Sequence, residues 1–326
     1  MEMEITPLNK DDLDNIVKSK TSRDCFGPEA EHPCLVLNLT DTDDTHRDWI
    51  YDLPCPVIGI GQGGLSKFCD VVVDDDKFLK SIIANIHKAP IASMILVQHL
   101  RASEKLNIKD ALTAESFAYS TVQQGPEFQQ WLTCYDNKPI LKKNTPQPLI
   151  SHINGNQLKL VLNDPDNHNA VGVIMRDALC EALDLALADS SIQQISLSGA
   201  GSCFSTGGEV GEFGAASDPA TAHWVRSLRL PAWCLARLHE RLHVHVHGCA
   251  IGAGAEMAGF GKRITASPDA WFQLPELKYG LIPGAGGTVS LPRRIGRQRT
   301  AYLALSMKRI TAQTALQWGL VDEIIS

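Results

Sequence analysis

Residues 242–258, LHVHVHGCAIGAGAEMA, combine a strand pattern, a glycine-rich turn and the beginning of a helix. Apolar residues alternate with histidine over 242–246, which predicts a strand. Glycines follow, and we expect a helix to begin near Ala253. Glycine lets backbone N–H groups approach a ligand closely, and a helix N-terminus adds a partial positive charge. The stretch therefore predicts a turn suited to an anion at the end of a strand.

The neighbouring sequence extends this pattern. Strand patterns at 157–162 and 192–197 flank an amphipathic helix pattern at 171–188. Strand, helix, strand implies a right-handed crossover. A further short strand is predicted at 271–272, and a helix is expected to open near Gly284. The second half of the chain is therefore predicted to be α/β.

The first part of the chain has a different pattern of polar and apolar residues. Residues 1–35 are polar and predict a lead-in segment with little to bury. Short β-branched runs bounded by glycine, proline or aspartate then predict strands, at 33–39, 55–60 and 69–75. From Lys77 to Leu132 the apolar residues recur at three- and four-residue intervals, which predicts a helical hairpin or bundle.

A polar stretch separates the two parts. Residues 135–145 contain Pro139 and predict a linker. We therefore expect a smaller mixed α/β to helical domain at 1–143 and an α/β domain at 144–326.

Composition narrows the class of protein. The chain has 326 residues, 44% hydrophobic and 21% charged, as expected of a folded globular protein. Its net charge of −7 offers no basic field for nucleic acid or anionic lipid, so we expect neither partner. The acidic start lacks the features of a secretory signal, and no apolar run reaches membrane-spanning length. The nine cysteines form no C-x-x-C pair and predict reduced thiols in the cytoplasm.

Glycine-rich turns occur at three places. They are 204–209 (FSTGGE), 248–256 (GCAIGAGAE) and 282–287 (IPGAGG). Any one of them can be explained as a tight turn alone, but three together favour a site. If N–H groups from two turns converge on one oxygen they form an oxyanion hole, worth roughly 3 to 4 kcal/mol per donor.

Several motifs, in this order, resemble the crotonase, or enoyl-CoA hydratase/isomerase, superfamily. They are Asn169-Ala170, FSTGGEVGEF at 204–213, VHGCAIGAGAEMA at 246–258, LPELKYGLIPGAGGT at 274–288, and LPRRIGRQRTAYLAL followed by ITAQTALQWGLVDEI at the end. The resemblance covers about residues 155–326. It implies a crotonase-like (ββα-superhelix) catalytic domain and a homo-oligomer, either a trimer or a hexamer.

The resemblance also implies the catalytic groups. The amides of Gly208 and Ala253 would bind the carbonyl oxygen of a thioester, and Glu256 and Glu276 match the two glutamates of family hydratases. Adding water to an enoyl thioester requires a carboxylate to activate the water and a carboxylic acid to protonate carbon. Both glutamates stand among apolar residues, which favours a catalytic role over the solvated surface position usual for glutamate.

Coenzyme A is implied as part of the substrate, with no permanently bound cofactor and no metal. Four residues of one turn would line the pantetheine and adenine path: Thr206, Glu209, Val210 and Gly211. Gly284 would place a helix N-terminus near Glu276.

These features predict hydration of a 2-enoyl-CoA, or the reverse dehydration. The alternatives are an enoyl-CoA isomerase or acyl-CoA hydrolase of the same fold, a non-catalytic regulatory subunit, and a zinc peptidase. The last rests on the H-E-x-x-H spacing of His239 and His243. Zinc binding needs a helix through both histidines, whereas 242–246 predicts a strand.

Three other patterns are weaker. G-x-G-x-x-G at 59–64 leaves no room for a nucleotide-binding helix before the next strand, and predicts a turn. The acidic runs 41–44 and 74–76 predict solvated loops. The arginines at 293, 294, 297 and 299 predict a solvated helix surface.

The chain departs from the family at its ends. Family members usually continue for several helices beyond the segment that matches GLVDEI, whereas this sequence stops at Ser326. Residues 70–132 resemble that helical tail, and CPVIGIGQGG at 55–64 weakly resembles the family core. We expect the N-terminal part to supply the cover, and to be a degenerate copy because no glutamate follows its GQGG turn.

Overall fold

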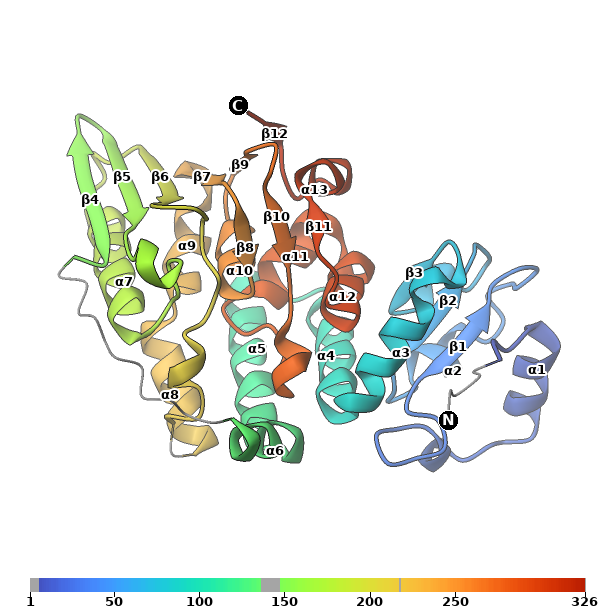
Figure 1. The fold of residues 1–326 in the computed structure, drawn as a ribbon. Coiled ribbons are helices and arrows are strands. Elements are labelled where there is room, and N and C mark those ends of the chain that lie inside the picture. The colour runs from blue at the N-terminus through green and yellow to red at the C-terminus, as the bar shows by residue number, and fades with distance from the viewer. Residues whose placement is uncertain (1–5, 136–146, 217, 326) are drawn as a thin grey trace.

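The computed structural model describes residues 6–135, 147–216 and 218–325 (Figure 1). The N-terminal part contains a three-stranded parallel sheet in the order β1-β2-β3. Its strands and the two flanking helices are β1 (Leu35–Asn38), β2 (Val57–Ile60), β3 (Val71–Val73), α1 (Lys10–Lys18) and α2 (Arg47–Tyr51). Four helices follow: α3 (Leu79–Lys88), α4 (Pro90–Ser103), α5 (Ile108–Gln123) and α6 (Pro126–Cys134). The predicted strands and the predicted helical segment of this part are confirmed.

The second part is built on a six-stranded sheet in the order β12-β9-β7-β6-β5-β4. Neighbouring strands are parallel except β4 and β5, which form a hairpin. The strands are β4 (Leu149–Asn154), β5 (Gln157–Leu162), β6 (Gln194–Gly199), β7 (Leu242–Val246), β9 (Arg263–Ala266) and β12 (Glu323–Ile324). A small sheet, β11-β10-β8, comprises β8 (Cys249–Ile251), β10 (Trp271–Gln273) and β11 (Ile310–Thr311).

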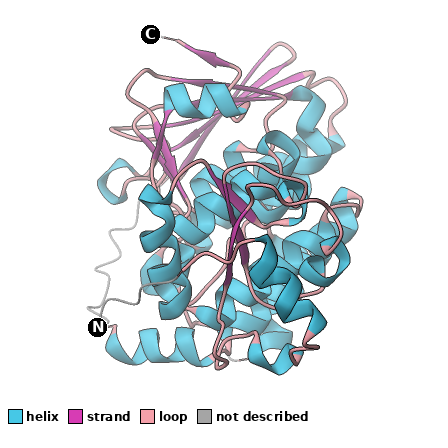
Figure 2. Ribbon diagram, turned by 90° about the vertical axis from the view of Figure 1, so that its right-hand side faces the viewer, coloured by secondary structure: helices cyan, strands magenta, loops and turns pink. Residues whose placement is uncertain are grey.

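Helices accompany these strands, which makes the second part α/β as predicted. They are α7 (Val173–Ala188), α8 (Pro219–Arg229), α9 (Pro231–Leu238), α10 (Ala253–Ala258), α11 (Gly287–Ile295), α12 (Arg297–Ser306) and α13 (Ala312–Trp318). The N-terminal sheet lies at one end of the molecule and β4 at the other (Figure 1). Figure 2, viewed from the end that carries the N-terminal sheet, shows strands flanked by helices. Within the described residues, no helix combines the length and the apolar character needed to cross a membrane.

The predicted elements of the second part agree closely with the structure. Strands β5 and β7 have the predicted bounds, whereas α7 and β6 each begin two residues later than expected. Strand β4 was not predicted. It pairs with β5 through a turn at Gly155, whose φ of 58° suits glycine. Apart from Tyr135, the predicted linker lies outside the described residues.

The N-terminal lead-in buries more than predicted. Helix α1 begins with a capping box, in which the Asn9 side chain accepts from the Asp12 amide and the Asp12 side chain accepts from the Asn9 amide. Leu13 from this helix and Phe26 are buried in a small core beneath the N-terminal sheet. The expectation that residues before Cys34 bury little is therefore wrong, because a few apolar side chains in a polar segment are enough to dock it.

The main hydrophobic core crosses the predicted boundary at residue 143. Buried residues of α3 to α6, such as Ile82, Leu96, Leu112 and Phe128, belong to the same cluster as the core of the six-stranded sheet. Helices α3 and α4 contact α12, and α5 contacts α8, α9 and α11. Residues 79–134 thus pack against the second part of the chain, and the two share one continuous hydrophobic core.

A buried charge cluster joins the N-terminal sheet to two helices. Asp70, immediately before β3, is 1% exposed and pairs with Arg101 of α4 and with Arg297 of α12, the latter at 2.9 Å. The Asp70 carboxylate also accepts from the Val57 amide at 2.8 Å. Arg297 is therefore buried, and its predicted place on a solvated helix surface is wrong. Sequence spacing could not reveal this burial, because the partner of Arg297, Asp70, is 227 residues away.

Replacing Asp70 with asparagine should destabilise the protein strongly. The change leaves two buried guanidinium groups without their carboxylate, which typically costs about 3 to 5 kcal/mol. Urea unfolding followed by circular dichroism measures the loss. Asp74→Asn, an exposed change in the same strand region, is the matched control and should stay within about 0.5 kcal/mol of the parent. Equal losses in both variants would contradict the buried-cluster interpretation.

Candidate active site

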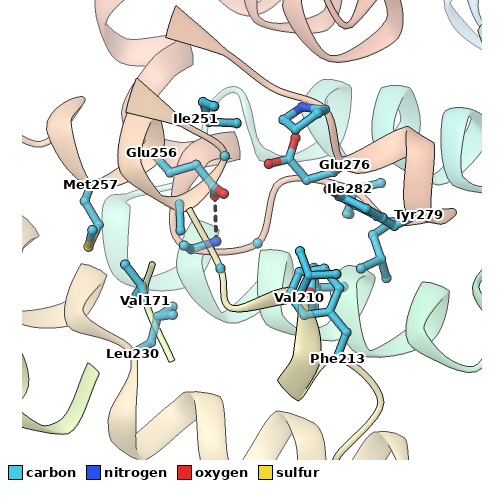
Figure 3. A pocket seen from close by; sticks show the side chains of 18 of the residues that line it. Val171, Val210, Phe213, Leu230, Ile251, Glu256, Met257, Glu276, Tyr279 and Ile282 are labelled. Atoms are coloured by element: carbon cyan, nitrogen blue, oxygen red, sulfur yellow. Dashed lines mark hydrogen bonds between the residues drawn. The ribbon is translucent and has the colours of Figure 1, made fainter. Parts of the chain in front are cut away.

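A pocket of about 220 Å³ lies where the three glycine-rich turns meet (Figure 3). Its walls are largely apolar, and two carboxyl groups, Glu256 and Glu276, face into it. The apolar lining labelled in Figure 3 consists of Val171, Val210, Phe213, Leu230, Ile251, Met257, Tyr279 and Ile282. The structure therefore brings residues of all three glycine-rich turns together around one pocket.

The first two glycine-rich turns lie side by side. The Ser205 amide donates to the carbonyl of Cys249 at 3.1 Å, and the Ile251 amide donates back to Ser205 at 3.0 Å. At Gly207, where φ is 90°, a Cβ atom would stand 2.5 Å from the Ile251 carbonyl oxygen. Only glycine therefore allows the turns to approach this closely.

The amides of Gly208 and Ala253 both border the pocket. Ala253 is the first residue of α10, where backbone N–H groups have no acceptor within the helix. The residues before and after Gly208 form the backbone hydrogen bonds to Val171. The Gly207 carbonyl accepts from the Val171 amide, and the Glu209 amide donates to the Val171 carbonyl. In the described chain neither amide has a backbone acceptor, so both are available to a ligand.

Glu256 projects from α10 and is only 2% exposed. Its Oε2 accepts hydrogen bonds from the amides of Ala285 at 2.6 Å and Gly287 at 2.8 Å. Burial raises the pKa of Glu256 well above its ordinary value, and the charges of Glu276 and Glu115 raise it further. The two amide donors act in the opposite direction.

Glu276 opens a short 3-10 turn, Glu276–Tyr279, on the other side of the pocket. Its Oε1 packs against Gly252, where a Cβ atom would approach to 2.7 Å. Its buried Oε2 has no hydrogen-bond partner in the described part of the chain. Burial is the main cause that raises the pKa of Glu276, to about 8. The pKa values of both neighbouring carboxyl groups are therefore raised, and the pair holds a proton more firmly than two exposed glutamates would.

Helix α5 of the N-terminal part contributes to the same site. Tyr119 lines the pocket and packs against Gly284, where a Cβ atom would lie 2.1 Å from the Tyr119 ring. Arg226 of α8 lies over that ring, 4.2 Å from its centroid. Glu115, one turn before Tyr119, is fully buried beside the 285–288 turn. The sequence identified none of these residues, although helical spacing places Glu115 and Tyr119 on one face of α5.

The other predicted substrate contacts divide into two groups. Thr206, Val210 and Gly284 line the pocket. Glu209 and Gly211 lie outside the lining: Glu209 accepts from the Gly211 amide at 3.2 Å and from the Asn167 side chain at 2.6 Å. These contacts hold the turn itself.

The helix expected near Gly284 begins at Gly287, and its N-terminal amides face Glu256 and Glu115. Gly286, whose φ is 98°, turns the chain immediately before the helix starts. The expected nearness of this helix N-terminus to Glu276 stays a prediction.

The H-E-x-x-H histidines lie on different elements. Helix α9 ends at Leu238, His239 lies in a single 3-10 turn, and His243 lies in β7. His239 Nδ1 is 2.7 Å from the Phe260 carbonyl oxygen. The predicted change from helix to strand is confirmed. Among the described residues, no group of three His, Cys, Asp or Glu side chains is arranged to hold a metal ion.

Comparison with known proteins agrees with this geometry. The family model described as enoyl-CoA hydratase/isomerase matches residues 152–326, more than half of the chain. The chain therefore belongs to the enoyl-CoA hydratase/isomerase family, and the crotonase-like fold expected from the sequence is confirmed.

Relatives in this family include both hydratases and isomerases. The chain is 34% identical over 168 residues to a 2,3-dehydroadipyl-CoA hydratase of Escherichia coli, covering 51% of this chain and 65% of that protein. It is 33% identical over 183 residues to a 1,2-epoxyphenylacetyl-CoA isomerase of E. coli, covering 54% and 69%. The chain thus spans about two thirds of the length of these relatives.

A solved enoyl-CoA hydratase from Mycobacterium smegmatis superposes with a TM-score of 0.51 at 25% identity, over 55% of this chain and 70% of that one. An enoyl-CoA hydratase/isomerase from Mycobacterium abscessus gives the same TM-score at 29% identity, over 55% and 70%. The match to the family model covers the second part of the chain, residues 152–326.

Proposed function

We propose that this protein adds water across the double bond of a 2-enoyl-CoA thioester, and catalyses the reverse dehydration. The observation that carries the proposal is that one pocket combines two carboxyl groups with two amides that have no backbone acceptor among the described residues. Coenzyme A enters as part of the substrate, and no permanently bound cofactor is needed. Thr206, Val210 and Gly284 contact the substrate, while Glu209 and Gly211 hold the shape of the turn.

The two acids have different surroundings and therefore different roles. Glu256 receives two N–H donors on one oxygen, which oppose the rise of its pKa and fix its orientation, and we assign it the role of general base. Oε2 of Glu276 has no donor among the described residues, and we assign the shared proton to this carboxyl group, which suits a general acid. Two neighbouring buried acids titrate as a pair, and the active pair carries one proton.

The reaction then balances as an addition of water. The Gly208 and Ala253 amides hydrogen-bond to the thioester oxygen. Glu256 takes a proton from water, whose oxygen bonds to C3, and the double-bond electrons move to form an enolate. Glu276 gives its proton to C2, and the enolate returns to the thioester. The amide donors stabilise charge that develops only in the transition state, so they raise kcat.

The activity should fall on the alkaline side near pH 8. Glu276 must be protonated to act as the acid, and its pKa is about 8, so kcat/KM decreases as pH rises through that value. Glu256 must be ionised to act as the base. Because its pKa is raised, the fall of kcat/KM on the acidic side of the pH profile should lie above the ordinary carboxyl pKa near 4.5. Initial rates with crotonyl-CoA across the pH range measure both limbs. A flat kcat/KM between about pH 7 and 10 would contradict the assignment of Glu276.

The loss of enoyl-thioester absorbance in purified protein with crotonyl-CoA tests the proposal directly. Conversion of a 3-enoyl-CoA without hydration would instead indicate an isomerase, and release of free coenzyme A would indicate a hydrolase. Activity that a chelator removes would favour zinc. Neither turnover nor coenzyme A binding would favour a non-catalytic, regulatory subunit.

We also propose that the protein forms a homo-oligomer. Large apolar side chains are exposed on α5 and α8: Phe117 at 55%, Trp224 at 63% and Leu228 at 65%. Light scattering coupled to gel filtration measures the molar mass, and a monomer at all concentrations would contradict this part of the proposal.

A further inference from the structure

The turn that opens α11 is held from two sides by two carboxylates. Glu256 accepts from the amides of Ala285 and Gly287, at 2.6 and 2.8 Å. Glu115 accepts from the alternate amides, those of Gly286 at 2.8 Å and Thr288 at 3.0 Å. Four successive N–H groups therefore point alternately to one carboxylate and to the other.

Burial raises the pKa of Glu115 above its ordinary value, while Arg226 and the hydrogen-bond donors around the carboxylate oppose that rise. Its Oε2 also accepts from the Thr288 hydroxyl at 2.6 Å, so donors approach both of its oxygens. Arg226 lies 3.8 Å from Oε1. Burial lowers the pKa of His99 to about 4, and the neutral ring lies 2.8 Å from the Thr288 hydroxyl through Nε2. Since the Thr288 hydroxyl donates its hydrogen to Glu115, it accepts a hydrogen bond from the Nε2–H group of His99.

Glu115 comes from α5 in the N-terminal part, while the turn and Glu256 belong to the family-like part. Without a carboxylate at position 115, the amides of Gly286 and Thr288 would be buried without an acceptor, and the turn would rearrange to satisfy them. That rearrangement would move the Ala285 and Gly287 amides, because each lies one peptide away. Glu256 would then lose the two bonds that fix its orientation.

We propose that Glu115 is a positioning residue, which holds the 285–288 turn so that Glu256 presents its second oxygen to the reacting water. This inference rests on the proposed hydration. It gives the N-terminal helices a role in the reaction beyond covering the pocket, since one of them supplies a group that orients the general base.

The test is Glu115→Gln, with Glu127→Gln as the matched control. Glutamine at 115 would place an NH₂ group against backbone N–H donors. Glu127 also binds two backbone amides at the start of a helix, those of Ile91 at 2.6 Å and Ala92 at 2.9 Å, but lies outside the pocket lining. We expect Glu115→Gln to lower kcat for crotonyl-CoA by about 100-fold with little change in KM. Glu127→Gln should keep the parent kcat.

A second readout separates positioning of Glu256 from general damage to the site. Exchange of the C2 hydrogens of butyryl-CoA with deuterated solvent needs the two amides and the ionised form of Glu276, which takes a proton from C2 and returns a deuteron, but it needs no water activated by Glu256. In Glu115→Gln this exchange, followed by NMR, should stay within about threefold of the parent while hydration falls about 100-fold. Equal losses in the two reactions would overturn the positioning role.

If Glu115→Gln does not fold, Thr288→Val and Thr288→Ser decide the question. Valine at 288 keeps the amide that donates to Glu115 but removes the hydroxyl donor. We expect the loss of this one hydrogen bond to lower kcat about fivefold. Serine should retain the parent rate, and equal rates in the two variants would overturn the inference. Inactive parent protein would instead refute the proposed hydration, whereas active parent with an equally active Glu115→Gln variant refutes this inference alone.

Discussion

Glu276→Gln is expected to lower kcat for crotonyl-CoA hydration by about 10² to 10⁴-fold, because glutamine keeps the size of the side chain but has no acidic proton to give to C2. Glu256→Gln should cause a loss of the same order, since the water then has no base. Steady-state rates at neutral pH measure both effects. Binding of crotonyl-CoA, measured by calorimetry, should persist because neither change removes the amide donors.

Glu240→Gln is the matched control for these two variants. Glu240 is the glutamate of the H-E-x-x-H pattern, its side chain is 75% exposed, and it pairs with Lys262 at 3.0 Å. Its replacement should leave hydration unchanged. Full activity in Glu276→Gln, or a large loss in Glu240→Gln, would contradict the assignment of the catalytic acids.

Ala253→Pro is expected to reduce kcat by about 10² to 10³-fold, the range measured when one oxyanion donor is removed. Proline lacks the backbone N–H, and the first position of a helix tolerates it well. Helices α4, α6, α8 and α9 of this chain already begin with proline. Thermal unfolding should therefore change little, while single-turnover rates with crotonyl-CoA should fall.

Ala253→Ser keeps the amide and serves as the control for Ala253→Pro. It should retain most of the parent rate. If the proline variant is as active as the serine variant while remaining folded, the Ala253 amide does not bind the developing oxyanion, and the proposed site has to be placed elsewhere.

Local patterns predicted the elements that form the site. The alternation over 242–246 placed β7 within its observed bounds, and the glycines after it placed the start of α10 at Ala253. The resemblance singled out Glu256 and Glu276, and the structure brings both to one pocket. The two-residue turn Gly155-Asn156, between the paired residues Asn154 and Gln157, is a recognised hairpin signal and could have revealed β4.

Contacts between distant segments could not be predicted in this way. Helical spacing shows that Glu115 and Tyr119 share a face of α5, but not that this face meets a turn 171 residues later in the chain. Arg297 looked like a surface cation because its partner, Asp70, is 227 residues away. In both cases tertiary packing decides the environment of a charged group, and periodicity contains no information about it.

The role of the N-terminal part rests on the same kind of contact. Helices α3 to α6 share the main core and supply Tyr119 and Glu115 to the site. That residues 1–143 form a degenerate copy of the family fold stays a prediction.

A crystal structure of the Glu276→Gln variant with crotonyl-CoA bound tests the central claim most directly. We expect the thioester oxygen to lie about 2.7 to 3.1 Å from both the Gly208 and the Ala253 nitrogen atoms, with the Glu256 carboxylate facing C3 through a water molecule. A thioester oxygen bound away from these two amides, or an acyl chain outside the pocket, would contradict it.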